Sequence, residues 1–440
     1  MSLLRTDLSE VFKSKIKKIS SISLIYLIVL LIRSANALFI YSLSISYGIT
    51  TFLQGIIQGA YSLVEGLSGF IGGLVYDRSG PVKTLIMASI LITISYTLSS
   101  LIYLYRADPR ELIFPQIIAG LSASFLMTTS IALIAEETYG VSRRKRLFGV
   151  GGLEISNLSG YVVGFLIAAL IEFYSPEFIK GFIPSLLLAL IAFIISIVLS
   201  TMIRDYHGVA KISSRNLFYV ERRSLYLFPM WLGISILLGV AFVSVKILRN
   251  IVSESIIYSP NTATELSHGL SIYVALTALL LSLGILLGSY LSSLFEKTKT
   301  LLIGSLATPV ALISLGYFIN NIIARGTTLM NMKLKTFIYP EILIPLTTAL
   351  VGALLALMLP PSLLALLAEF TDTTRIRGLS SGIYVTTLGI GIFVGNILGG
   401  SIYDHFGLIP LTYIISAIFT PLSLITYVFV KRSLRGRVFG

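Results

Sequence analysis

The chain has 440 residues, of which 55% are hydrophobic and only 12% are charged, and its mean hydropathy is +0.91. This balance excludes a soluble globular protein and predicts an integral membrane protein. The net charge of +13 lies in short basic clusters between apolar runs, which indicates membrane topology rather than a nucleic-acid partner. With no cysteine and only 3 scattered histidines, we expect no disulfide, no metal site and no cofactor.

The segment 1–21 predicts a cytoplasmic interfacial helix. Its apolar residues recur at helical spacing from Leu4 to Ile19, and lysines are interleaved between Lys13 and Lys18. No small-residue cleavage site follows a short apolar region, so we expect no signal peptide.

Twelve apolar runs follow, each near the length of about 20 residues that crosses a bilayer. Six lie in segment 22–203 and six in 225–430, with a cytoplasmic linker at 204–224 and a basic cytoplasmic tail at 431–440. The sequence therefore predicts an all-α membrane protein built from two six-helix bundles. The predicted spans are 22–44, 51–76, 84–105, 113–135, 149–172, 181–203, 225–247, 266–294, 300–322, 342–368, 378–402 and 408–430.

The basic residues predict the orientation of these spans. With the amino terminus inside, the inner segments hold 24 of the 33 lysines and arginines. Cytoplasmic loops carry this excess in membrane proteins, so both termini are predicted to be cytoplasmic in a multi-pass protein of the cell membrane.

Two alignments of the chain with itself indicate that its halves are related. A shift of 216 places Gly72 on Gly288, and the run Lys83, Thr84 and Leu85 on Lys299, Thr300 and Leu301. A shift of 231 places Arg144, Arg146, Gly151, Gly160 and Gly164 on Arg375, Arg377, Gly382, Gly391 and Gly395. The two bundles are therefore expected to be pseudo-symmetric repeats.

The stretch GGLVYDRSG between the second and third spans resembles a loop of the major facilitator superfamily. That family's pattern is a glycine, three residues, Asp-Arg, one residue and a glycine, met by Gly73, Asp77, Arg78 and Gly80. Two further stretches, AEETYGVSRRKR and AEFTDTTRIRG, resemble the loop after the fourth span and its second-half counterpart. Their matching residues are Glu136, Arg146, Glu369 and Arg377. The resemblance implies two bundles that rock about a central cavity in alternating access, and a transporter rather than an enzyme.

These loop residues form the predicted cytoplasmic gate. Asp77 and Arg78 are placed to cap helix ends and to pair with Glu136 or Arg146. The alternative is topology alone, because basic residues here simply obey the charge bias. The second-half copy has Ser293 and Leu294 in place of the Asp-Arg pair, so an ionic latch at this loop is expected in one half only.

Arg33, in the middle of the first span, is the clearest candidate for function. A charge at that depth costs roughly 2.5–3.5 kcal/mol on insertion scales, so it requires a partner or a wet cavity. We expect it to bind an anionic group of the solute together with Asn36, because a guanidinium holds carboxylate or phosphate through two parallel hydrogen bonds. The alternative is a structural ion pair with Glu65 or Glu154.

Polar side chains on two other spans complete the predicted site. The second span carries Gln54, Gln58, Tyr61 and Glu65 on one stripe of a helix, which suits a cavity. The fifth span carries Glu154, Asn157 and Tyr161 on one face. The predicted substrate-binding residues are therefore Arg33, Asn36, Gln54, Gln58, Tyr61 and Asn157.

Glu65 and Glu154 are the predicted proton-coupling residues. The family often has an arginine linked to coupling four residues before a glycine in the fourth span, but here Gln116 precedes Gly120. A glycine stripe, Gly55, Gly59, Gly66 and Gly73, runs beside the polar stripe of the second span and suits close helix contact.

The favoured function is secondary transport of a small solute, with a lean to an organic anion and to proton coupling. One alternative is a multidrug or lipophilic-compound exporter, since Glu65 would neutralise Arg33 and leave an apolar cavity. A remote alternative is a membrane-embedded enzyme or a lipid-handling protein. The expected partners are a small-molecule substrate and the lipid bilayer, and the chain is expected to be a monomer that binds no nucleic acid.

Overall fold

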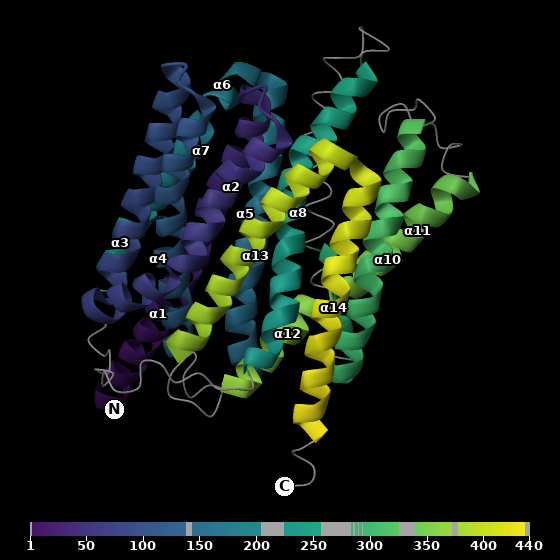
Figure 1. Cartoon of the computed structure of the whole chain (residues 1–440). Helices are drawn as coiled ribbons and strands as arrows, with labels where there is room; N and C mark the ends of the chain where they lie inside the picture. The colour runs from purple at the N-terminus through teal and green to yellow at the C-terminus, as the bar shows by residue number, and fades with distance from the viewer. Residues whose placement is uncertain are drawn as a thin grey trace.

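The structure is a computed structural model that describes residues 2–137, 143–203, 224–256, 283–284, 287–288, 290–292, 294–324, 339–371 and 377–435. All secondary structure in these ranges is helical. Both termini lie at the lower end of the bundle in Figure 1, and the turns at residues 47–50 and 407 lie at the upper end. We use "upper end" and "lower end" in this sense.

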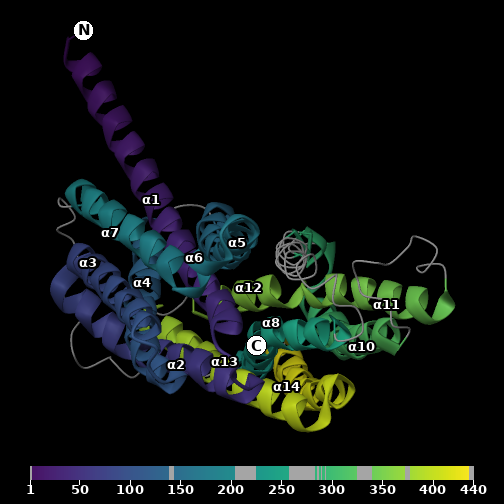
Figure 2. The ribbon, with the colours of Figure 1, turned by 90° about the horizontal axis from the view of Figure 1, so that it is seen from above.

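The first half contains the helices up to residue 203. Its longest helix, α1, runs without a break across the predicted boundary at residues 21 and 22, and its first turns project from the bundle in Figure 2. The elements are α1 (Ser2–Ser46), α2 (Thr51–Leu67), α3 (Gly69–Leu104), η1 (Pro109–Leu112), α4 (Ile113–Glu137), α5 (Arg143–Tyr174), α6 (Pro176–Lys180) and α7 (Ile183–Ile203).

The second half begins at residue 224. Its first long helix, α8, extends to Ile256, beyond the predicted span 225–247. Most of the predicted span 266–294 lies outside the described residues. The elements are η3 (Ser224–Leu227), α8 (Phe228–Ile256), α10 (Lys297–Ala324), α11 (Pro340–Ala356), α12 (Leu359–Thr371), α13 (Arg377–Phe406) and α14 (Leu408–Arg435).

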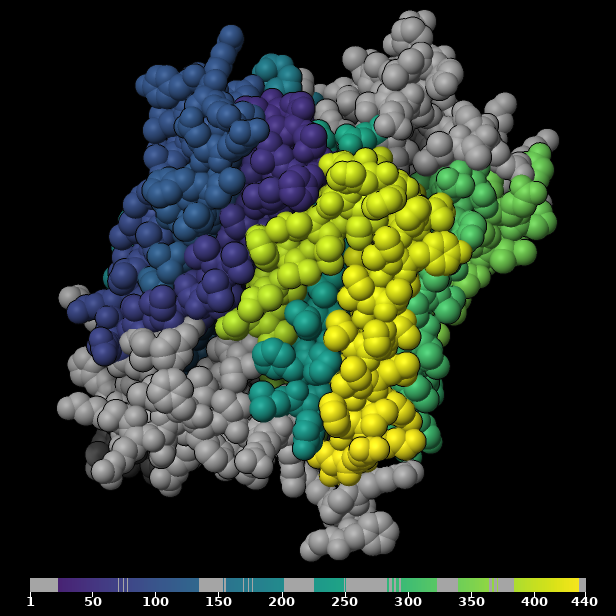
Figure 3. Space-filling view, viewed as in Figure 1, coloured from purple at the N-terminus to yellow at the C-terminus, as the bar shows by residue number. Residues whose placement is uncertain are grey.

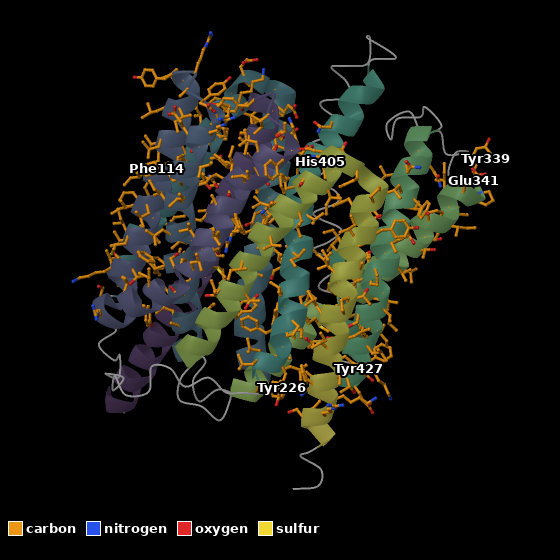
Figure 4. All side chains as sticks on the ribbon, viewed as in Figure 1. Phe114, Tyr226, Tyr339, Glu341, His405 and Tyr427 are labelled. Atoms are coloured by element: carbon orange, nitrogen blue, oxygen red, sulfur yellow. The ribbon has the colours of Figure 1, made fainter. Side chains whose placement is uncertain are left out.

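The exterior of this bundle is that of a membrane protein. In the described ranges, 9 helices are long and apolar enough to cross a bilayer, which is consistent with twelve spans in the whole chain. The outward side chains in Figure 4 are mostly carbon, as for Phe114. Tyr226 and Tyr427 lie at the lower end and Tyr339 at the upper end, where aromatic rings meet the headgroups of a bilayer.

Two predicted spans are not single continuous helices. In span 51–76, α2 ends at Leu67 and α3 begins at Gly69, and the Ser68 hydroxyl bonds back to the Val64 carbonyl. In span 342–368, α11 ends at Ala356 and α12 begins at Leu359. Pro360 and Pro361 supply no N–H to continue α11, whereas a first helical turn needs none.

The two halves meet along a seam between α2 and α13, which lie side by side across the face in Figure 3. A Cβ at Gly55 would lie 2.5 Å from the Asn396 carbonyl oxygen, and one at Gly59 would lie 2.8 Å from the Phe393 ring. Gly66 faces Gly389 in the same way. The prediction that the glycine stripe makes close helix contact is thus confirmed for Gly55, Gly59 and Gly66. It is wrong for Gly73, because nothing lies within 4 Å of the Cβ position there.

Gly66→Ala is expected to destabilise this seam. The added Cβ would lie 2.9 Å from Gly389 Cα and 3.0 Å from the Thr386 carbonyl oxygen, so the two backbones must separate. Such overpacking costs about 1–3 kcal/mol, which a lower Tm of the purified protein would record. Gly48→Ala is the control, because nothing lies within 4 Å of its Cβ position. Equal Tm values for the two variants would contradict the expectation.

Candidate functional site

Arg33 lies on α1 where that helix packs against α5. Its side chain is only 3% exposed. Gly160 of α5 makes this close approach possible, because a Cβ there would lie 2.6 Å from the Arg33 Cβ and 2.7 Å from the Leu30 carbonyl oxygen. The guanidinium is therefore enclosed by neighbouring helices and must find its partners there.

Glu65 of α2 is the charged partner of Arg33 among the described side chains. Arg33 Nη2 donates to Glu65 Oε1 at 2.5 Å, and Nη1 donates to Oε2 at 3.1 Å. The two parallel bonds form the bidentate geometry in which a guanidinium matches a carboxylate. The Glu65 side chain is 7% exposed, so both charges are shielded from solvent.

Two neutral side chains also accept hydrogen bonds from Arg33. Nη1 also donates to the Tyr61 hydroxyl at 2.6 Å, and Nε donates to Asn157 Oδ1 at 2.5 Å. We call Arg33, Glu65, Tyr61 and Asn157 the Arg33 cluster. It joins α1, α2 and α5. Next to it, the Asn36 amide donates to the Tyr161 hydroxyl at 3.3 Å, so the predicted residues of three spans do come together.

Gln54 and Gln58 differ from the other predicted substrate residues. Both are buried on α2, and their amide nitrogen and oxygen make no hydrogen bond within the described part of the chain. The same holds there for Gln116 of the neighbouring helix α4. A buried polar group without a partner costs roughly 1–3 kcal/mol. These three carboxamides therefore retain hydrogen-bonding capacity for water or for a solute.

Glu172 is a buried carboxylate that the sequence argument missed. It is 4% exposed on α5 and accepts a hydrogen bond from the Tyr41 hydroxyl. The predicted fifth span ended at this residue, whereas α5 continues to Tyr174. One signal was present: Glu172 follows Glu154 by 18 residues, which is five helical turns and returns to the same face.

Several predicted residues lie outside the described side chains. These are Glu154 of the coupling pair and the gate residues Asp77, Glu136, Arg146, Glu369 and Arg377. Among the gate residues that are described, Arg78 is exposed, and Gly80 adopts φ 77° at the turn within α3. The gate therefore stays a prediction.

The described residues contain no group of three or more His, Cys, Asp or Glu that could hold a metal ion. A groove of about 610 Å³ lies between α10 and α11 in the second half, with a largely apolar lining that includes Leu306, Val310 and Val351. The groove carries no charged side chain.

Comparisons with known proteins agree with the fold. The model of the Major Facilitator Superfamily matches residues 22–334. The chain is similar to the inward-open xylose transporter XylE from E. coli, with 15% identity, TM-score 0.66, and coverage of 94% of this chain and 96% of that one. It is also similar to a D-xylose-proton symporter, with 14% identity, TM-score 0.66, and coverage of 93% of this chain and 98% of that one. For the nucleoside transporter NupG the identity is 13%, the TM-score is 0.63, and the coverage is 94% of this chain and 99% of that one. At these identities the likeness concerns the fold alone, and no curated protein matches the chain.

The Arg33 cluster generates a stability prediction. Arg33→Ala leaves the Glu65 carboxylate buried without its cation, and breaking such a pair costs about 3–5 kcal/mol. Adding Glu65→Gln removes the stranded charge, so the double variant should recover part of the lost Tm. Lys180→Ala is the control, because the Lys180–Glu177 pair is exposed and surface pairs contribute little. A double variant no more stable than Arg33→Ala would contradict the pairing.

Proposed function

The chain belongs to the major facilitator superfamily and is a secondary transporter, and we propose that it moves a small organic anion together with a proton. The single observation that carries this proposal is the enclosed, bidentate Arg33–Glu65 pair. Members of the family are transporters rather than enzymes, which favours transport over the remote enzymatic alternative.

Proton coupling follows from the charge balance of the pair. Arg33 and Glu65 together are neutral, and protonating Glu65 leaves the enclosed guanidinium without a counter-charge among the side chains that the structure describes. An uncompensated buried charge is strongly unfavourable. Protonation is therefore favourable only when another anion takes the place of the Glu65 carboxylate. One proton and one anionic group then enter together, and the cluster stays neutral.

The geometry of Arg33 suits this exchange. The two donors that hold Glu65 match any carboxylate or phosphate oxygen pair. Tyr61 and Asn157 fix the orientation of the guanidinium while the anion changes. Gln54 and Gln58, with their unused amide groups, are the proposed contacts for the neutral part of the solute, and Asn36 is proposed to assist through its bond to Tyr161.

A second candidate is a neutral, hydroxyl-rich solute. The unpartnered carboxamides of Gln54 and Gln58 support it, because an amide both donates to and accepts from hydroxyl groups. The structural neighbours are described as transporters of xylose and of nucleosides. In this case the hydrogen bonds between Arg33 and Glu65 stay intact through the transport cycle. They would also stay intact in an exporter of lipophilic compounds.

The proposed orientation places the lower end, with both termini, in the cytoplasm. Its support is the excess of lysine and arginine in the segments predicted to be inner, 24 of 33 in the whole chain. A cell-membrane location and a monomeric state belong to the same proposal.

Uptake by proteoliposomes separates these candidates. An inward proton gradient should drive accumulation of carboxylates or organic phosphates and should leave neutral sugars, nucleosides and cationic dyes undriven. Glu65→Gln mimics the protonated carboxyl, so it should abolish gradient-driven accumulation while retaining anion exchange. Glu172→Gln is the matched control, since that buried carboxylate bonds to Tyr41. Accumulation that survives Glu65→Gln would exclude the proposed coupling through Glu65, and its survival in Glu154→Gln would exclude the other predicted coupling residue.

Arg33→Lys gives a graded test of anion binding. Lysine keeps the positive charge but lacks the planar fork, so KM for the anion should rise about 10-fold or more, as loss of a charge-assisted bond of roughly 1.5–3 kcal/mol requires. Arg33→Ala should abolish anion transport. A purely structural pair predicts another outcome: Arg33→Lys is nearly silent, and Glu65→Gln restores transport to Arg33→Ala.

A further inference from the structure

We infer that Asp404 and Lys246, both from the second half, form a latch that holds the upper end of the transporter closed. The inference rests on alternating access between two halves. It does not depend on the proposed anion or on proton coupling, since neither residue belongs to the Arg33 cluster. Each residue caps the end of a first-half helix, and both ends flank the short turn between α1 and α2.

Asp404 caps the start of α2. The backbone N–H of Phe52 donates to Asp404 Oδ2 at 2.8 Å. Phe52 lies in the first turn, where backbone N–H groups have no partner within the helix. Thr50 is the N-cap, and its hydroxyl accepts from Leu53 N–H. The carboxylate from α13 therefore satisfies a different donor, and a negative charge is favoured at this positive end of the helix.

Lys246 caps the end of α1. Its Nζ donates to the Ser44 carbonyl oxygen at 3.3 Å, in the last turn of a helix that ends at Ser46. A cation is favoured at a helix C-terminus. The second half thus presents an acid to the start of α2 and a base to the end of α1. Each charge meets the helix end of opposite sign.

The surrounding contacts leave little space between the halves at this end. The Asn250 amide donates to the Thr51 hydroxyl at 3.2 Å. A Cβ at Gly400 would lie 2.7 Å from the Thr51 carbonyl oxygen and 2.9 Å from Phe52 Cα. The backbones of α2 and α13 therefore touch beside the Asp404 bond, and opening this end requires that bond to break.

The sequence around Asp404 repeats the signature of the predicted cytoplasmic gate. GGLVYDRSG at 72–80 and GGSIYDHFG at 399–407 share two glycines, a tyrosine, an aspartate and a final glycine at the same spacing. The final glycines, Gly80 and Gly407, both have positive φ, 77° and 83°. One copy lies at the lower end and the other at the upper end. The repeated signature therefore assigns one acidic latch to each end, at Asp77 and at Asp404.

The latch can be tested with one reporter cysteine in nanodiscs, because the chain has no native cysteine. Thr51→Cys places the thiol at a fully buried position between the halves. Its labelling rate with a maleimide reports how often the upper end opens. In this background Asp404→Ala and Lys246→Met should each raise the rate about two- to fivefold, the range expected for one charge at a helix end. Asp404→Asn keeps an oxygen acceptor and should raise it less.

Two controls make the outcome decisive. Asp108→Ala removes an acidic cap at the same end, but that carboxylate accepts from Arg110 N–H within the first half, so the rate should not change. Ser89→Cys, as a separate reporter, records loosening of the first half alone, since Ser89 is buried there and bonds to Ser196. An unchanged labelling rate of the Thr51→Cys reporter in Asp404→Ala and Lys246→Met would overturn the latch. Equal acceleration of the Ser89→Cys reporter would also overturn it, because it assigns the two residues to overall stability.

Discussion

A guanidinium enclosed among membrane helices requires an opposite charge, and this requirement shapes the first half. Arg33 meets it through Glu65, which joins α1 to α2, and the neutral Asn157 accepts a further bond that joins α5 to α1. The side chains reach one another only because the helices approach closely. Gly160 of α5 lets that helix pack closely against α1, and Gly120 of α4 packs against the α2 backbone at Tyr61 and Glu65. Charge pairing and small residues therefore act together, because the glycines bring α5 to α1 beside Arg33 and α4 to α2 beside Glu65.

The described buried polar and charged side chains differ between the two halves. The buried carboxylates in the described residues, Glu65 and Glu172, both lie in the first half. The buried polar residues described in the second half are mainly serines and threonines, many of which bond within their own helix. Lys246 is the buried charge described there, and it reaches across to α1. Among the described residues, the buried ion pair therefore lies in the first half, and the second half packs against that half along the seam between α2 and α13.

The sequence predicts the fold and the polar faces of the helices around Arg33, because both depend on local rules. Apolar runs of bilayer length identify the spans, and helical spacing places Tyr61 and Glu65 on one face. The breaks after Leu67 and Ala356 were missed, since apolar character continues across both.

Contacts between distant helices have no such local signal. Spacing along α2 predicts a glycine stripe but not that α13 is the helix facing it. The choice between Glu65 and Glu154 as the partner of Arg33 also depends on helix rotation, which the sequence pattern leaves open. The same is true of the bond between Asp404 and the start of α2, because 352 residues separate its two ends.

The glycine seam between α2 and α13 has a kinetic consequence. At Gly66 and Gly389 the two helices meet backbone to backbone, with no side chain interlocked between them at that point. Rotation of one half against the other about this line changes few rotamers, and so encounters little of the steric resistance that interdigitated side chains impose. With the proposed latch, the barrier to reorientation is expected mainly at the upper end, where the contacts of Asp404 and Lys246 must be broken. The rate of the cycle would then depend on a few polar contacts, and substitutions that leave the central packing untouched would adjust it.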